Sequence, residues 1–312
     1  MSLKSSSSLQ FLIPYFDVER PCRWHEHFAR RAPLVVEIGF GLGEVLSQNA
    51  ANHPEKNFIG IETNWERIYK TMNRFRRGGL RSGGNVRIIR LDALIALERL
   101  FQEKSIDALY CLFPCPWPKK KHAKHRLFSN TTLKLINSRL KLGSCARIVT
   151  DFLPYVDWIE EQLPNTGFII KKREIDPQFD TKFEKKWRSQ GQEKFFEILL
   201  KKTKHVSSKV KKDVRMKNYR LSNFNPAKFK LEETKGDITL VPRQVLFDQC
   251  KNVCLVHGLV VEENLKQDFW ASISKKDRGW VLKRADGHYF FPTPGIAKAL
   301  GLIYEAAERS GS

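Results

Sequence analysis

The chain reads LYCLFPCPWPKKKHAKHR over residues 109–126. The apolar run at residues 106–113 predicts a buried strand. Pro114, Pro116 and Pro118 follow it, and they fix φ and prevent helix formation and strand pairing. We therefore expect a stiff, irregular loop at the carboxyl end of this strand.

This loop contains an aromatic residue followed by a cluster of cations. The aromatic is Trp117, and the cations are Lys119, Lys120, Lys121, Lys124 and Arg126. Open α/β sheets bind ligands outside the carboxyl ends of their strands. Because a rigid aromatic beside cations suits base stacking and phosphate contact, the stretch predicts a nucleic-acid site. The alternative is a proline-rich connection with solvated lysines.

Composition sets the class of partner. The chain has 312 residues, 41% of them hydrophobic, and a net charge of +21. Such an excess favours a polyanion, nucleic acid first and an anionic membrane surface second. No apolar run approaches the roughly 20 residues that span a bilayer, and the patch at residues 12–16 is too short for a signal peptide. The six cysteines lack the density of a disulfide scaffold. We expect reduced thiols, a cytoplasmic location and no membrane, with monomer and homodimer both open.

A glycine turn follows the first predicted strand. Residues 34–43 read LVVEIGFGLG, and a helical pattern covers residues 44–51. Gly39, Gly41 and Gly43 let backbone N–H groups approach a ligand at the start of that helix. The spacing differs from the dinucleotide motif G-x-G-x-x-G. Glu37, just before the turn, can bind the ammonium of an amino-acid-like cofactor but would repel a pyrophosphate.

The next two predicted strands also end in acids. Glu62 ends the strand at residues 57–61, 19 residues after Gly43, a separation at which an acid bonds a ribose diol. Asp92 and Ala93 end the strand at residues 87–91, where an acid can meet an adenine amino group. Each acid alone could be a solvated strand end. Together they predict S-adenosylmethionine as the cofactor.

The alternation of predicted strands and helices continues to residue 201. A basic segment, residues 69–84, is either a solvated helix face or an RNA contact. A helix at residues 131–140 precedes strands at 146–150, 167–172 and 194–201. Asp151 follows the first of these as a rim residue or as a helix N-cap. The alternation over residues 33–201 predicts a doubly wound α/β sheet.

These motifs resemble those of the bacterial tRNA (guanine-N7-)-methyltransferase family over roughly residues 33–201. The similar stretches are EIGFGLG from Glu37, GIE ending at Glu62, the Asp92–Ala93 pair, FPCPWPKKKH from Phe113, Thr150–Asp151, and TKFE from Thr181. The resemblance implies a Rossmann-like enzyme that transfers a methyl group from S-adenosylmethionine to N7 of a variable-loop guanosine in tRNA.

Residue pattern and resemblance together assign the site. The cofactor-binding residues are Glu37, Gly39, Gly41, Gly43, Glu62, Asp92 and Ala93. The pattern predicts Trp117 as a substrate-binding residue, and the resemblance implies that the others are Lys119, Asp151, Thr181, Lys182, Phe183 and Glu184. The family's loop reads FPDPWPK, so Cys115 stands at its catalytic aspartate position. The alternative is a non-catalytic tRNA-binding or scaffold protein that keeps this fold.

The C-terminal third lies outside this resemblance. We expect an arm at residues 1–32, the methyltransferase domain at 33–204, a basic linker at 205–222 and a small α+β accessory domain at 223–312. The last domain contains a predicted helix at 243–256 and a predicted strand at 289–291. On that helix Cys250, Cys254 and His257 lie at i, i+4 and i+7, but no fourth ligand is evident, so no metal is expected.

Overall fold

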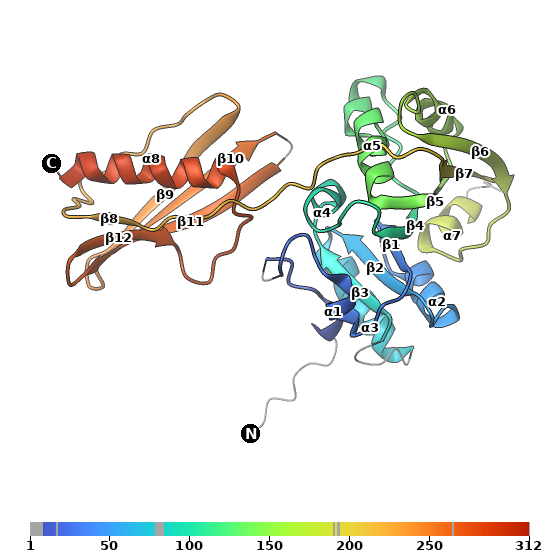
Figure 1. Cartoon of the computed structure of the whole chain (residues 1–312), viewed down its shortest axis with the longest axis horizontal. Helices are drawn as coiled ribbons and strands as arrows, with labels where there is room; N and C mark the ends of the chain where they lie inside the picture. Colours follow the sequence, from blue (N-terminus) through green and yellow to red (C-terminus); the bar gives the residue numbers. More distant parts are fainter. Residues whose placement is uncertain are drawn as a thin grey trace. The chain divides into compact units, whose positions relative to one another are not determined.

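The computed structural model describes residues 9–16, 18–78, 84–189, 191, 194–263 and 265–311. The chain forms two compact units, Met1–Lys211 and Lys212–Ser312 (Figure 1).

The first unit is built on a seven-stranded sheet of order β3-β2-β1-β4-β5-β7-β6. Its strands are β1 (Leu34–Ile38), β2 (Asn57–Glu62), β3 (Val86–Arg90), β4 (Ile106–Leu112), β5 (Leu140–Thr150), β6 (Phe168–Ile175) and β7 (Phe195–Lys202). Every residue of β1 and β2 is buried, as expected for parallel strands covered on both faces.

Helices alternate with these strands, and the predicted Rossmann-like doubly wound sheet is confirmed. They are α1 (Trp24–Phe28), α2 (Glu44–Asn52), α3 (Trp65–Arg77), α4 (Ala93–Arg99), α5 (Asn130–Arg139), α6 (Leu153–Glu161) and α7 (Lys182–Ser189). Side-chain caps define several starts: Asn64 accepts from Arg67 N at 3.0 Å, and Ser129 accepts from Thr132 N at 3.3 Å. Such caps satisfy N–H groups that have no partner within the helix.

Strand direction gathers the site at one edge of the sheet, which we call the rim. β1, β2, β4 and β5 run parallel, so their carboxyl ends meet there. β7 is antiparallel to both β5 and β6, and Phe195 at its start pairs with Ile175 at the end of β6. Phe195 packs there in a buried apolar cluster with Val45, Val149 and Phe179. This cluster packs next to the rim, because Val149 lies near the end of β5 and Val45 near the start of α2.

The described residues of the predicted N-terminal arm pack onto the first unit. The short 3₁₀ helix η1 (Leu9–Phe11) ends in the fully buried Phe11, whose ring lies 5.2 Å from that of Phe75. Ile13 N donates to Ile88 O at 2.9 Å, and Trp24 stacks on Phe101. These contacts attach residues 9–28 to the sheet and its helices.

The second unit is a five-stranded antiparallel sheet of order β8-β12-β11-β10-β9. Its strands are β8 (Tyr219–Leu221), β9 (Ile238–Asp248), β10 (Val253–Glu262), β11 (Leu265–Lys276) and β12 (Gly279–Arg284), and they precede α8 (Pro294–Gly311). Ile296, Leu300 and Ile303 of α8 pack against buried residues of the sheet, such as Val256 and Phe269.

The predicted helix at residues 243–256 is wrong, because this segment forms the hairpin of β9 and β10. A turn at residues 249–252, in which Asn252 has φ +51°, reverses the chain. Cys254 is buried in the core cluster, whereas His257, an odd number of positions along the strand, stacks on Trp270 on the other face. The helical spacing assumed for Cys250, Cys254 and His257 therefore does not exist. The predicted strand at 289–291 is also wrong, since these residues are irregular.

Candidate active site

The glycine turn connects β1 to α2 in a left-handed conformation. Gly39, Gly41 and Gly43 have φ values of +68°, +59° and +69°. A Cβ added at Gly43 would lie 2.3 Å from the Thr71 methyl carbon, whereas one added at Gly39 would meet no atom within 4 Å. Gly43 is thus required for helix packing, and Gly39 leaves open space above the turn.

Glu37 lies beneath this turn in β1 and is only 3% exposed. Its Oε2 has no hydrogen-bond partner among the described residues. Burial, together with repulsion from Glu44, raises the pKa of this carboxyl to about 8. A buried polar atom without a partner is costly, and a ligand ammonium placed beside Oε2 would remove that cost. The cofactor role predicted for Glu37 fits this geometry.

Glu62 joins two turns at the carboxyl end of β2. Its Oε1 accepts from Thr63 N at 2.8 Å and Asn64 N at 3.0 Å, while Oε2 accepts from Gly41 N at 3.3 Å and from Arg67 at 3.4 Å. The side chain is 6% exposed. These four bonds fix the carboxylate beside the glycine turn and occupy its acceptor sites. A ribose diol would bind there by replacing the two long bonds to Oε2, from Gly41 N and Arg67.

Asp92 begins α4 as its N-cap. Oδ1 accepts from Leu94 N at 2.9 Å and Ile95 N at 3.2 Å, and the residue itself is exposed. Ala93 is the first residue of the helix. The cap orients the carboxylate at the end of β3, on the same rim as Glu37 and Glu62.

The proline loop after β4 is held in a strained conformation. Phe113 and Trp117 have φ values of +54° and +45°, which cost energy for non-glycine residues. The Phe113 ring packs 5.2 Å from that of Phe195. Cys115 lies exposed between the two strained positions. The fold thus fixes the ends of the loop and presents Cys115 to solvent.

Arg126 fastens this loop from inside. Its Nε donates to Pro116 O at 2.9 Å and its Nη2 to Trp117 O at 3.3 Å. The guanidinium lies 5.0 Å from the Trp158 ring centroid and 5.6 Å from that of Tyr155. The prediction that counted Arg126 among the phosphate-facing cations is therefore wrong. No local signal in the sequence indicated this role, because Tyr155 and Trp158 lie 29 and 32 residues further along the chain.

The Trp117 ring is half-buried between two histidines. Its centroid lies 5.7 Å from that of His122 and 5.2 Å from that of His125, both in the short 3₁₀ helix η2 (Lys120–His125). Lys119 is exposed beside it. The histidine contacts support the Trp117 ring at the rim.

Asp151 directly follows β5 and is half-buried, and this burial raises its pKa. The N-cap alternative for Asp151 is wrong, because the cap residue of α6 is Phe152, which makes no side-chain cap bond. Asp151 therefore remains available at the rim, between the proline loop and α6.

The TKFE motif forms a helix cap. Thr181 Oγ1 accepts from Glu184 N at 3.1 Å, which is the spacing of a capping box. The carboxylate of Glu184, 2% exposed, accepts from Gln178 N at 2.6 Å and Phe179 N at 2.9 Å. Both polar side chains thus hold the segment before α7. Lys182 is exposed, and the side chain of Phe183 lies outside the described residues.

Two features are absent from the described residues. None of their helices combines the length and apolarity needed to cross a membrane. Within the same residues, no group of three or more His, Cys, Asp and Glu side chains is arranged to hold a metal ion.

A Rossmann-like sheet with an open glycine turn above a buried carboxyl, whose Oε2 has no partner among the described residues, is typical of an S-adenosylmethionine-dependent methyltransferase. Residues 31–226 match a family model described as "Putative methyltransferase". A tRNA (guanine-N(7)-)-methyltransferase of Chlorobium phaeobacteroides is 47% identical over 186 residues, covering 59% of this chain and 90% of that protein. The chain belongs to the tRNA (guanine-N(7)-)-methyltransferase family.

Other relatives with that name extend further along the chain. The Aquifex aeolicus protein is 30% identical over 257 residues, covering 80% of this chain and 85% of its own. The Thermotoga maritima protein is 29% identical over 306 residues, covering 94% and 95%. The expectation that the C-terminal third lies outside the similarity is therefore wrong.

Proposed function

We propose that this protein transfers the methyl group of S-adenosylmethionine to N7 of a guanosine in the variable loop of tRNA. The observation that carries the proposal is the unpartnered Oε2 of Glu37, buried beneath the glycine turn at the rim that also bears Trp117. The names of the relatives supply the base and the class of RNA.

Three acids and the turn would hold the cofactor. Glu37 would bind its ammonium, Glu62 its ribose diol and Asp92, with Ala93, its adenine. Gly39 and Gly41 would let backbone N–H groups approach it, and Gly43 keeps α2 close to α3. When bound, S-adenosylmethionine supplies an electrophilic methyl group on a positively charged sulfur.

The chemistry requires orientation more than proton transfer. Guanine N7 carries a free lone pair, so a bond forms from N7 to the methyl carbon as the carbon–sulfur bond breaks, and no proton leaves. No general base is needed, and the protein's contribution is alignment of the reacting atoms. Trp117 would stack on a base of the RNA, and Asp151 and Lys119 would contact the target nucleotide.

Glu184 and Thr181 would act on the substrate indirectly. Their side chains are bonded to backbone N–H groups, so we propose that they position Lys182 and Phe183 of α7. Lys182, which is exposed, would then provide the direct RNA contact.

Cys115 is proposed as the residue that limits the rate. A carboxylate at this position could accept the N–H groups of guanine, and a neutral thiol accepts poorly. One charged hydrogen bond is worth about 1.5–3 kcal/mol, or roughly ten- to a hundredfold in rate. Cys115→Asp should raise kcat by that factor, whereas Cys115→Ala should leave it near wild type. An unchanged rate for Cys115→Asp would contradict this role.

A cytoplasmic location is part of the proposal. All six cysteines are free thiols, among them the exposed Cys115 and Cys250. Exposed thiols persist in a reducing compartment.

The function is tested by product analysis. The full chain is incubated with S-adenosylmethionine and unmodified tRNA, and the nucleosides are identified by mass. N7-methylguanosine mapped to the variable loop is the expected result. Methylation of another base, or none while the cofactor binds, would overturn the proposal.

A further inference from the structure

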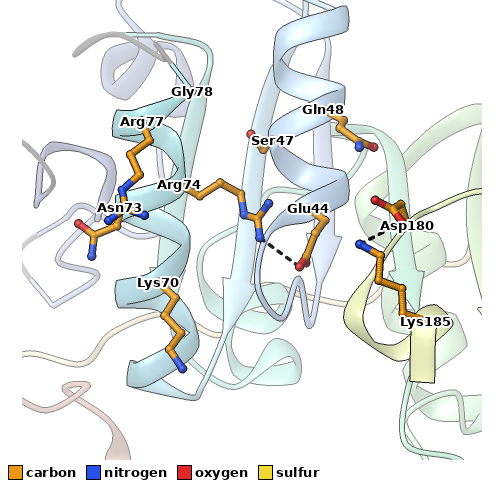
Figure 2. Close-up of a pocket in the computed structure, with 10 residues that line it drawn as sticks. All are labelled: Glu44, Ser47, Gln48, Lys70, Asn73, Arg74, Arg77, Gly78, Asp180 and Lys185. Carbon is orange, nitrogen blue, oxygen red and sulfur yellow. Dashed lines mark hydrogen bonds and ion pairs between the residues drawn. The ribbon is translucent and has the colours of Figure 1, made fainter. Parts of the chain in front are cut away.

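A cleft of about 730 Å³ opens on the surface between α2, α3 and the segment that begins α7 (Figure 2). Among the described residues, the side chains that line it are charged, amide or hydroxyl groups, together with Gly78. Small-molecule pockets are mostly apolar. The lining therefore suits a strongly hydrated, charged ligand.

Cations outnumber acids in this cleft. The cations are Lys70, Arg74, Arg77 and Lys185, and the acids are Glu44 and Asp180. Each acid is already paired within the cleft, Glu44 with Arg74 at 3.1 Å and Asp180 with Lys185 at 3.0 Å (Figure 2). The remaining cations, Lys70 and Arg77, give the cleft an excess of positive charge.

Neither remaining cation is firmly held. Within the part of the chain that the structure describes, Arg77 has no ion-pair or hydrogen-bond partner. Lys70 pairs with Glu66 one turn earlier in α3, and both side chains are more than half exposed. Such exposed pairs are weak, so Lys70 can exchange Glu66 for another anion at little cost.

The spacing of these cations fits a chain of phosphates. Lys70, Asn73, Arg74 and Arg77 lie at i, i+3, i+4 and i+7, on one face of α3 (Figure 2). Seven residues of helix span about 10 Å, and successive phosphates of a duplex strand rise about 3.4 Å along its axis, so more than one phosphate can lie along this face. A polynucleotide backbone presents several phosphates in a row, so Lys70 and Arg77 can each contact one of them.

The cleft is also attached to the glycine turn. Arg74 Nε donates to Leu42 O at 3.0 Å, so the residue that neutralises Glu44 also holds the turn. Lys70 foremost, and Lys182 of α7 more weakly, lower the pKa of Glu66. Lys182 therefore lies close to the first turn of α3, which links the cleft to the proposed RNA contact on α7.

We propose that this cleft binds the sugar–phosphate backbone of the tRNA, with Lys70 and Arg77 as its phosphate contacts. This inference rests on the proposed function, because tRNA is the polyanion in question. The charge of the chain agrees with it. Residues 1–211 contain 38 Lys and Arg against 22 Asp and Glu, which is +16 of the total +21.

The test compares two double variants of the full chain. Lys70→Gln/Arg77→Gln removes the proposed contacts, and Lys104→Gln/Lys171→Gln removes two exposed lysines elsewhere on the same unit. Binding of labelled, unmodified tRNA is measured by fluorescence anisotropy over a salt series, and cofactor binding by calorimetry.

We expect the cleft variant to bind tRNA at least tenfold more weakly, with a salt slope smaller by about 1 to 2. The control should stay within about threefold of wild type, and both should bind S-adenosylmethionine normally. Equal tRNA affinity for the two variants would overturn the proposal, as would a wild type that binds no tRNA. A wild type that binds tRNA without methylating it would refute the proposed function. The proposal for the cleft would still be decided by comparing the tRNA affinities of the two variants.

Discussion

Glu37 makes cofactor binding depend on pH. Its folded pKa is about 8, raised by burial from 4.5, so below pH 8 the ligand-free site holds a neutral carboxyl. A bound ammonium requires the carboxylate, and binding must release a proton. Affinity for S-adenosylmethionine should therefore rise with pH from 6 to a maximum at about 8. It should fall above that pH, because the α-amino group of the cofactor, with a pKa of about 8, then loses its proton. Calorimetry in buffers of different ionisation enthalpy would report the released proton.

The matched control is Glu37→Gln. This variant keeps the shape of the side chain but cannot titrate, so its weakened binding should show no proton release and a much flatter pH profile. Affinity in the wild type that is independent of pH would contradict the assignment of Glu37 to the ammonium.

Substitution by alanine should have different effects on stability at Gly43 and at Gly39. A Cβ at Gly43 would overlap Thr71, whereas one at Gly39 would enter open space. Both positions have positive φ, which costs about 1–2 kcal/mol for alanine. We expect Gly43→Ala to lose clearly more free energy of unfolding than Gly39→Ala, and Gly39→Ala to weaken cofactor binding. Denaturant unfolding measures the free energy of unfolding, and calorimetry measures cofactor binding. Equal unfolding free energies for the two variants would contradict the packing role of Gly43.

Among the elements, α7 begins within the TKFE motif, and Glu184 of this motif holds the preceding segment by accepting hydrogen bonds from Gln178 N and Phe179 N. Glu184→Gln removes a charged acceptor of two backbone N–H groups and should cost about 1–3 kcal/mol. Amide hydrogen exchange at Gln178 and Phe179 should become faster. KM for tRNA should rise, because the segment before α7 would be less ordered and would position Lys182 less well. Glu174→Gln, at an exposed position of β6, is the control. Unchanged exchange in Glu184→Gln with a lower kcat would instead indicate direct contact with the substrate.

The elements of the first unit could be predicted because the signal is local. The apolar runs at 57–61 and 106–113 predicted β2 and β4, since strands buried on both faces read as continuous apolar runs. Once these strands are predicted to be parallel, the acids at the carboxyl ends of β1, β2 and β3 are expected on one rim. The hairpin of β9 and β10 was not predictable in this way, because its Val and Leu spacing also suits a helix.

The rest of the site depends on contacts distant in sequence. Arg126 bonds Pro116 O and packs on Tyr155 and Trp158, which lie 29 and 32 residues further along. Only the fold brings that helix to the loop. The cleft likewise combines α2, α3 and the start of α7. Sequence pattern predicted which acids lie on the rim, but not that Arg126 supports the proline loop.

At the scale of the whole molecule, each unit has its own core. One buried cluster, which includes Phe269 and Ile303, lies entirely in the second unit, and the clusters around Phe58 and Phe195 lie in the first. A chain ending at Lys211 should therefore fold and bind S-adenosylmethionine within about threefold of the full protein. Failure of the truncated chain to show cooperative unfolding by calorimetry would contradict it.

Methyl transfer to guanine N7 can be tested by replacing that atom. Two tRNA transcripts are compared, one with guanosine and one with 7-deazaguanosine, in which carbon replaces N7 throughout. We expect N7-methylguanosine from the first transcript and no methyl incorporation into the second, although both transcripts bind. Equal incorporation into the 7-deaza transcript would show that the enzyme methylates another atom, and transfer to N7 would then be refuted.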